Sequence, residues 1–243
     1  KSPTDQVINI SEEMFTMLSF AEDLYIKTSG LYDITLGSLI IDEGFGPSVS
    51  MSEESIQVSS KRFEFISDSS IIKNDNFQFD LSSIAKGFAV DSVSRILLAA
   101  GKNNFLIDIG GEIIINGSKH NQPWAIGIQD PTSMNNSSII NIFGNDFLAV
   151  ATSGEYRNFK YNDDGEMTSH TFNPISKTSI PDKTYSVSVV SRVSSMEADA
   201  LATALNVMGP VKGIKFANEK DLSVMYIMQG KNLIKSNKWN YND

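Results

Sequence analysis

DLSSIAKGFAVD, residues 80–91, is the stretch that decides the fold prediction for this chain. Apolar and polar residues alternate over residues 77–81, as in a half-buried strand, and we expect a strand there. Ser82 and Ser83 then offer hydroxyls at a helix start, where the first amides lack partners. Apolar residues continue at helical spacing until Gly101, which is placed to end the helix. The stretch therefore predicts a strand, a short turn and a helix.

Lys86 lies in the first turn of this predicted helix. Free amides and the helix dipole favour an anion at that end, so a strand–turn–helix of this kind is a candidate phosphate site. A cation there is unfavourable unless something negative lies beside it. Lys86 therefore implies either a bound anion or a nearby carboxylate, and the alternative is a solvated surface lysine.

The composition of the 243-residue chain is that of an ordinary globular protein, with 41% hydrophobic and 20% charged residues. Its formal charge of −9 argues against a nucleic-acid surface, which needs basic clusters. The absence of cysteine excludes disulfides, thiolate catalysis and cysteine-ligated metals. The two histidines, His120 and His170, are too few for a histidine-rich metal centre. No apolar run approaches the ~20 residues that span a bilayer.

The rest of the chain predicts short strands mixed with helices. Ser11 with two acids behind it predicts a helix start, and Gly110-Gly111 between two apolar runs predicts a hairpin. Residues 62–66 are expected to pair with residues 77–81 around a turn at Asn74-Asp75. We expect a single α+β domain over residues 1–243, with mixed or antiparallel sheets and packed helices.

Several polar residues stand out against their surroundings. Asp33 lies inside an apolar run and is either a ligand-binding residue or a capping aspartate. Asp199 and Thr203 are four residues apart on a predicted helix, so they share a face and suit a hard cation such as Mg²⁺. The alternative is a first-turn acid and a threonine that bonds back to its own helix. His170 precedes Asn173-Pro174 on a predicted loop, where it is either functional or structural.

Four stretches carry a resemblance when they are taken together and in order. They are SGLYDITLGSLI (29–40), DLSSIAKGFAVD running on to LIDIGGEI (80–113), ATSGEYRNF followed by SHTFNP (151–174), and MEADALATALNVMGP (196–210). Together they resemble the ApbE-type FMN transferases, a family long labelled thiamine-biosynthesis lipoproteins. The resemblance covers roughly residues 10–229 and implies an ApbE-like domain around a flavin-nucleotide cleft, lacking the family's usual N-terminal part.

The resemblance also implies an activity. Enzymes of this family use FAD as substrate and Mg²⁺ as cofactor to attach FMN, through a phosphoester, to a Ser or Thr hydroxyl of an acceptor protein, and AMP is released. Some members instead hydrolyse FAD to FMN and AMP, and a non-catalytic flavin-binding protein is a further alternative. The resemblance implies an extracytoplasmic lipoprotein, with membrane anchoring through an N-terminal lipid-modified segment, and no nucleic-acid partner.

Individual residues match the family's functional positions. His170 matches the residue proposed as catalytic. The Ser83 backbone carbonyl matches a metal ligand, and Asp199 and Thr203 match the side-chain metal ligands. The positions that match FAD contacts are Leu31, Tyr32, Asp33, Asp80, Lys86 and Phe172.

Four positions depart from the family's usual residues. Asn173 stands where aspartate is usual in the histidine loop, and Lys177 stands where glycine is usual. Asp108 and Glu112 flank the predicted hairpin turn, where asparagine and aspartate are usual. None of these changes removes a matched metal ligand.

Overall fold

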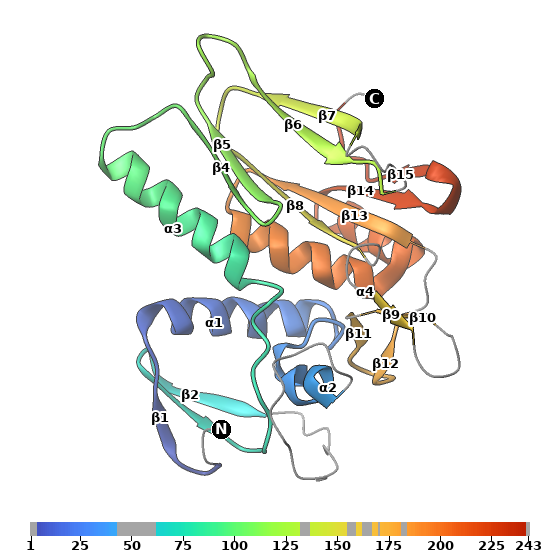
Figure 1. The fold of residues 1–243 in the computed structure, drawn as a ribbon. Helices are drawn as coiled ribbons and strands as arrows, with labels where there is room; N and C mark the ends of the chain where they lie inside the picture. Colours follow the sequence, from blue (N-terminus) through green and yellow to red (C-terminus); the bar gives the residue numbers. More distant parts are fainter. Residues whose placement is uncertain are drawn as a thin grey trace. The chain divides into compact units, whose positions relative to one another are not determined.

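The computed structural model describes residues 4–42, 62–131, 137–154, 159–161, 167–169, 171–180 and 184–241. It divides into two units, which are described separately: unit 1 contains residues 1–82 and 172–178, and unit 2 contains residues 83–171 and 179–243. Figure 1 labels their helices and strands. The expectation of one domain over residues 1–243 stays a prediction. None of the helices described is long and apolar enough to cross a membrane.

Unit 1 is built on a three-stranded sheet with strand order β1-β3-β2, next to helix α1. The Ser11 hydroxyl accepts a hydrogen bond from Met14 N at 3.2 Å and starts α1, as predicted. The Phe15 ring of α1 packs edge-on against Phe65 of β2. The elements of unit 1 are β1 (Val7–Asn9), α1 (Glu12–Lys27), η1 (Ile34–Leu36), α2 (Gly37–Asp42), β2 (Phe63–Ser67), β3 (Ser70–Lys73) and β11 (Phe172–Asn173).

The predicted strand over residues 77–81 is wrong. The partner of β2 is β3, across a turn at residues 68–69 rather than at Asn74-Asp75. Residues 77–81 instead bond to the η1–α2 segment: Gln78 O accepts from Gly37 N at 3.1 Å, and Asp80 N donates to Ile34 O at 2.7 Å. The alternating pattern indicates an extended chain with a buried aromatic side. It does not determine which other segment that chain forms hydrogen bonds with.

Unit 2 contains a six-stranded sheet with strand order β15-β14-β13-β8-β5-β4, in which every neighbouring pair is antiparallel. The Gly110-Gly111 hairpin joins β4 to β5, as predicted, with both glycines at positive φ. The elements of unit 2 are α3 (Ala85–Ala99), β4 (Phe105–Ile109), β5 (Glu112–Asn116), β6 (Trp124–Gln129), β7 (Ser138–Gly144), β8 (Leu148–Ser153), β9 (Phe159–Tyr161), β10 (Met167–Ser169), β12 (Thr178–Ser179, beginning at the end of unit 1), β13 (Thr184–Ser191), α4 (Ser195–Glu219), β14 (Ser223–Met228), η2 (Gln229–Lys231) and β15 (Leu233–Lys235).

The two faces of this sheet are buried against different elements. Ile114 and Ala149 belong to a core cluster with Val90 of α3, and helices α3 and α4 both contact the sheet. Their chain neighbours Ile115 and Val150 point the other way, into a larger cluster with the β6–β7 hairpin. Unit 2 therefore has three layers, with helices, the six-stranded sheet and the β6–β7 hairpin in that order (Figure 1).

Helix α3 starts later than the sequence pattern predicts, and without a serine cap. Its N-cap is Ile84, which makes no side-chain capping bond, and the Ser82 hydroxyl bonds to Asp80 instead. A carboxylate two residues earlier is the stronger partner for that hydroxyl. The other end agrees with the prediction, because Gly101 follows the C-cap with a φ of +71°. Gly209 and Pro210 break α4 in two, since Gly209 has non-helical backbone angles.

Helices α3 and α4 approach each other closely at Gly87. A Cβ atom at Gly87 would lie 2.4 Å from Ser195 O and 2.7 Å from Met196 Cα, so only glycine fits. One turn later in α3, the two carboxylate oxygens of Asp91 accept hydrogen bonds from Ser195 N at 2.8 Å and Met196 N at 2.9 Å. Asp91 thus satisfies the first free amides of α4 and fixes the register of the two helices.

We expect Gly87→Ala to lower the free energy of unfolding by about 2–3 kcal/mol, because the added methyl group must push backbone rather than a movable side chain. Gly101→Ala is the matched control. It also replaces a glycine by alanine, just after the C-cap of α3, but nothing lies within 4 Å and the change adds only the strain of a positive φ, about 1 kcal/mol. Urea unfolding followed by circular dichroism measures both. Equal losses for the two variants would contradict the close-packing explanation.

Candidate metal and nucleotide site

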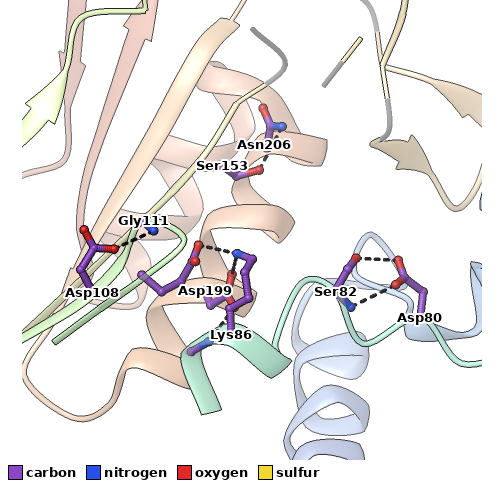
Figure 2. A network of polar contacts seen from close by, with 10 residues as sticks. Asp80, Ser82, Lys86, Asp108, Gly111, Ser153, Asp199 and Asn206 are labelled. Carbon is purple, nitrogen blue, oxygen red and sulfur yellow. Dashed lines mark hydrogen bonds and ion pairs between the residues drawn. The ribbon is translucent and has the colours of Figure 1, made fainter. Parts of the chain in front are cut away.

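The candidate site in unit 2 is centred on Asp199, in the second turn of α4. Its Oδ2 atom accepts a hydrogen bond from Gly87 N at 2.9 Å, and its Oδ1 atom lies 3.6 Å from Lys86 Nζ (Figure 2). Lys86 and Gly87, which are consecutive in α3, therefore each lie next to a different oxygen of the Asp199 carboxylate. Asp199 is only 4% exposed, so its carboxylate belongs to the interior of unit 2.

Glu112, the first residue of β5, is the second carboxylate at this site. Its Oε1 atom lies 2.5 Å from Lys86 Nζ, and the residue is 3% exposed. Lys86 thus contacts two buried carboxylates, which confirms the prediction that something negative lies beside it. The adjacent hairpin turn is held by Asp108, whose Oδ1 atom accepts from Gly111 N at 2.9 Å, and an asparagine there would accept the same bond (Figure 2).

Burial dominates the electrostatics of both carboxylates. Desolvation raises the pKa of Asp199, and the nearby Lys86 ammonium and the Gly87 amide act in the opposite direction. Desolvation likewise raises the pKa of Glu112, the charge of Asp199 raises it further, and Lys86 lowers it. The ammonium group of Lys86 is therefore the charged neighbour that opposes the rise in the pKa of both carboxylates.

The donor types at the positions matched to metal ligands suit a hard cation. Thr203 lies one helical turn after Asp199 on α4 and is half-buried, and Ser83 lies just before α3. A carboxylate, a hydroxyl and a backbone carbonyl are all oxygen ligands, as Mg²⁺ prefers. No group of three His, Cys, Asp or Glu side chains that could hold a metal occurs in the described part of the chain. The residue types at these matched positions therefore fit a magnesium ion.

Continuing along the same face of α4, Asn206 donates a hydrogen bond to Ser153 Oγ at 3.3 Å (Figure 2). Residues 199, 203 and 206 are spaced so that they line one side of the helix. This side faces the end of β8, where Ser153 lies. The polar face beginning at the candidate metal ligands is thus longer than the pair that the sequence pattern singled out.

In unit 1, Asp33 caps η1. Its Oδ1 atom accepts from Thr35 N at 2.8 Å and from Thr35 Oγ1 at 2.6 Å. Its Oδ2 atom lies 3.6 Å from Arg62 Nη1, in an ion pair whose side chains are both less than one-tenth exposed. The capping interpretation of Asp33 is confirmed, and its contact with FAD stays a prediction. The sequence analysis missed Arg62, although an arginine at the start of an apolar strand was a usable signal.

Of the other residues matched to FAD contacts in unit 1, Asp80 makes hydrogen bonds within the unit and the remaining three are buried or half-buried. Asp80 accepts hydrogen bonds from Ser82 N at 3.0 Å and Ser82 Oγ at 2.9 Å (Figure 2). Tyr32 and Phe172 are buried, and Leu31 is half-buried. These contacts describe the protein alone, and the roles of the four residues toward a nucleotide stay predictions.

The loop around the matched histidine is described only in part, since His170 lies outside the described residues. Asn173 Oδ1 accepts from Ile175 N at 2.9 Å and from Ser176 N at 3.2 Å, which an aspartate would do equally well. Lys177 has a φ of +56°, the left-handed conformation that glycine adopts without strain. The backbone of this turn thus accounts for glycine as the residue usual in the resembled family.

Comparisons with known proteins show which family the chain belongs to. The family model described as the ApbE family matches residues 1–227. The chain belongs to the ApbE family. A relative from Vibrio cholerae serotype O1, named FAD:protein FMN transferase, is 34% identical over 90% of this chain and 68% of its own length. A protein of the same name from Escherichia coli K12 is 29% identical, over 90% of this chain and 65% of the relative. The chain thus spans about two thirds of the length of these ApbE relatives.

Solved structures of ApbE proteins share the fold. The flavin transferase ApbE from Vibrio cholerae superimposes with a TM-score of 0.81 and 29% identity, covering 97% of this chain and 78% of the other. The ApbE protein from Thermotoga maritima gives a TM-score of 0.83 and 25% identity, over 97% and 79% of the two chains. The predicted ApbE membership and α+β fold class are confirmed, and the prediction of an enzyme agrees with the names of the relatives.

We expect Asp33→Ala to lower the free energy of unfolding of the ligand-free protein by about 2–4 kcal/mol, because it removes a helix cap and leaves the buried Arg62 without its carboxylate. Asp33→Asn is the matched control, since its amide oxygen can still accept from Thr35 N, and a smaller loss is expected. Urea unfolding measures both variants. If Asp33→Ala unfolds like the wild type and only FAD affinity falls, Asp33 is a ligand-binding residue and not a structural one.

Proposed function

We propose that this protein is a Mg²⁺-dependent FAD:protein FMN transferase. The observation that carries the proposal is the buried Asp199 carboxylate, which shares a helix face with Thr203 and is bonded on one oxygen to the start of α3. Buried acids with raised pKa values next to a lysine are typical of functional sites. The names of the ApbE relatives supply the reaction class.

The proposed reaction exchanges one phosphoester partner for another. A Ser or Thr hydroxyl oxygen of the acceptor protein forms a bond to the phosphorus on the FMN side of FAD. The bond from that phosphorus to the bridging oxygen breaks, and AMP leaves with that oxygen. A magnesium ion held by Asp199, Thr203 and the Ser83 carbonyl would neutralise the pyrophosphate and stabilise the charge that develops during transfer. Lys86, at the start of α3, adds a further positive charge close to Asp199.

The first test separates three functions by measuring AMP. The protein is incubated with FAD and Mg²⁺, with and without a candidate acceptor protein. Release of AMP only with acceptor indicates the transferase, and release without acceptor indicates an FAD pyrophosphatase, in which water replaces the hydroxyl. Binding of FAD without AMP release indicates a flavin-binding protein.

We expect Asp199→Asn to reduce AMP release by ~10²-fold or more, because a neutral amide is a poor ligand for a hard cation and several kcal/mol of charge stabilisation are lost. Asparagine is chosen because Asp199 is buried and accepts a hydrogen bond from Gly87 N. Asp199→Ala would remove that bond and also lower stability, whereas a residue that acted only as a metal ligand could be changed to alanine without that loss. The control is Asp221→Asn, which alters an exposed ion pair with Lys238. Wild-type turnover in Asp199→Asn would contradict the metal assignment.

We further propose that His170 is the general base that takes the proton of the acceptor hydroxyl. The support is chemical: a hydroxyl is a poor nucleophile until its proton is removed, and a neutral imidazole is suited to that task at working pH. The other histidine, His120, lies in the turn before β6, outside all the matched stretches. The resemblance to the family matches His170 to the catalytic position.

Removal of this base should change the pH profile. In the wild type, the rate should rise as the pH passes through the pKa of an imidazole, ~6.5, because only the neutral ring accepts a proton. His170→Asn should remove that rise and reduce the rate by ~10²–10⁴-fold while FAD and Mg²⁺ still bind. A His170→Asn variant with the wild-type rate and pH profile would show that the histidine is structural.

A further inference from the structure

Two buried carboxylates share one lysine at the start of α3. The carboxylate side chains of Glu112 and Asp199 are 3% and 6% exposed, whereas the Lys86 side chain is 44% exposed. The two acids are thus enclosed by the fold, and the ammonium group reaches them from the solvent side. Of the three groups, Lys86 is the one that can change position without unpacking the core of unit 2.

The two oxygens of Asp199 have different partners. Gly87 N holds Oδ2 at 2.9 Å, and this amide belongs to the helix backbone. Oδ1 lies 3.6 Å from Lys86 Nζ, beyond the distance of a good charge-assisted hydrogen bond. Asp199 therefore keeps its orientation through Oδ2 when the partner of Oδ1 is exchanged.

Glu112 gives Lys86 a stronger partner than Asp199 does. Its Oε1 atom lies 2.5 Å from Lys86 Nζ, and its Oε2 atom is buried with no hydrogen-bond partner among the described residues. An unpaired carboxylate oxygen beside the ammonium group leaves room for that group to bond more fully to Glu112. If Lys86 loses its contact with Asp199, it therefore still has the Glu112 carboxylate as a negative neighbour.

We propose that Lys86 is an internal placeholder for the divalent cation at Asp199, and that Glu112 is the positioning residue that retains Lys86 when the cation binds. This inference rests on the proposed function, which makes Asp199 a metal ligand. Without a cation, the ammonium group balances the buried Asp199 charge. A divalent cation on Oδ1 repels that ammonium, which then pairs with Glu112 alone.

The proposal predicts that the net charge of the trio formed by Lys86, Glu112 and Asp199 determines the affinity for a divalent cation. With all three groups charged, Glu112, Asp199 and Lys86 together carry one net negative charge. Lys86→Met raises this to two negative charges and removes the competitor at Oδ1. Glu112→Gln makes the trio neutral and leaves Lys86 with Asp199 as its remaining carboxylate. The double variant returns to a single negative charge, on Asp199.

The test is calorimetric titration of the chain with Mn²⁺, a substitute for Mg²⁺, in the absence of FAD and at one fixed, mildly alkaline pH for all variants. Lys86→Met should bind Mn²⁺ on the order of tenfold more tightly than the wild type, and Glu112→Gln on the order of tenfold more weakly. The double variant should lie between them, near the wild type. The matched controls Lys102→Met and Glu219→Gln change exposed residues of the same types and should leave Mn²⁺ affinity unchanged.

Mn²⁺ affinity in Lys86→Met that equals or falls below the wild-type value would overturn the placeholder role, provided that Asp199→Asn abolishes binding. The proposed function fails separately, if Asp199→Asn retains both Mn²⁺ binding and AMP release. Far-ultraviolet circular dichroism checks that each variant is folded. Should Lys86→Met fail to fold, Lys86→Gln removes the same charge with a polar side chain and carries the same expectation.

Discussion

The close contact between α3 and α4 is the constraint on which the candidate site depends. Gly87 allows Ser195 to approach because it has no side chain, and Asp91 then binds the first amides of α4. Both residues belong to the stretch 80–91, so one short segment sets the distance and the register of two helices. The position of Asp199 relative to Lys86 follows from that register, since both lie within a turn or two of the contact.

Much of unit 2 could be predicted from the sequence, because its signals are local. The Gly110-Gly111 turn, the Gly101 helix end and the Gly209-Pro210 break each need only nearby residues. The prediction of a strand at residues 77–81 was wrong because their hydrogen bonds go to residues 34–37, more than forty positions away. An alternating pattern does not determine the segment to which a chain bonds. The serine cap failed for a related reason, since a competing carboxylate at Asp80 takes the Ser82 hydroxyl.

The candidate site was predictable in part. The spacing of Asp199 and Thr203 identified a helix face, and the unfavourable position of Lys86 implied a negative neighbour. That the neighbours are Asp199 and Glu112 depends on β5 and α4 meeting α3, a long-range arrangement that no local pattern contains. Asp33 is a residue whose role the sequence could not decide. An acid in an apolar run has the same sequence pattern whether it caps η1 or binds a ligand.

In the proposed function, Asp199 has both a structural and a chemical role, and each role belongs to one of its two oxygens. Oδ2 bonds to the backbone of α3, so the fold depends on it. Oδ1 faces a half-exposed ammonium group that is itself anchored to Glu112. A buried carboxylate is ordinarily difficult to use in chemistry, because freeing it leaves an uncompensated charge. Here Lys86 supplies the compensation in the absence of a ligand, so that the carboxylate can be both enclosed by the fold and open to exchange.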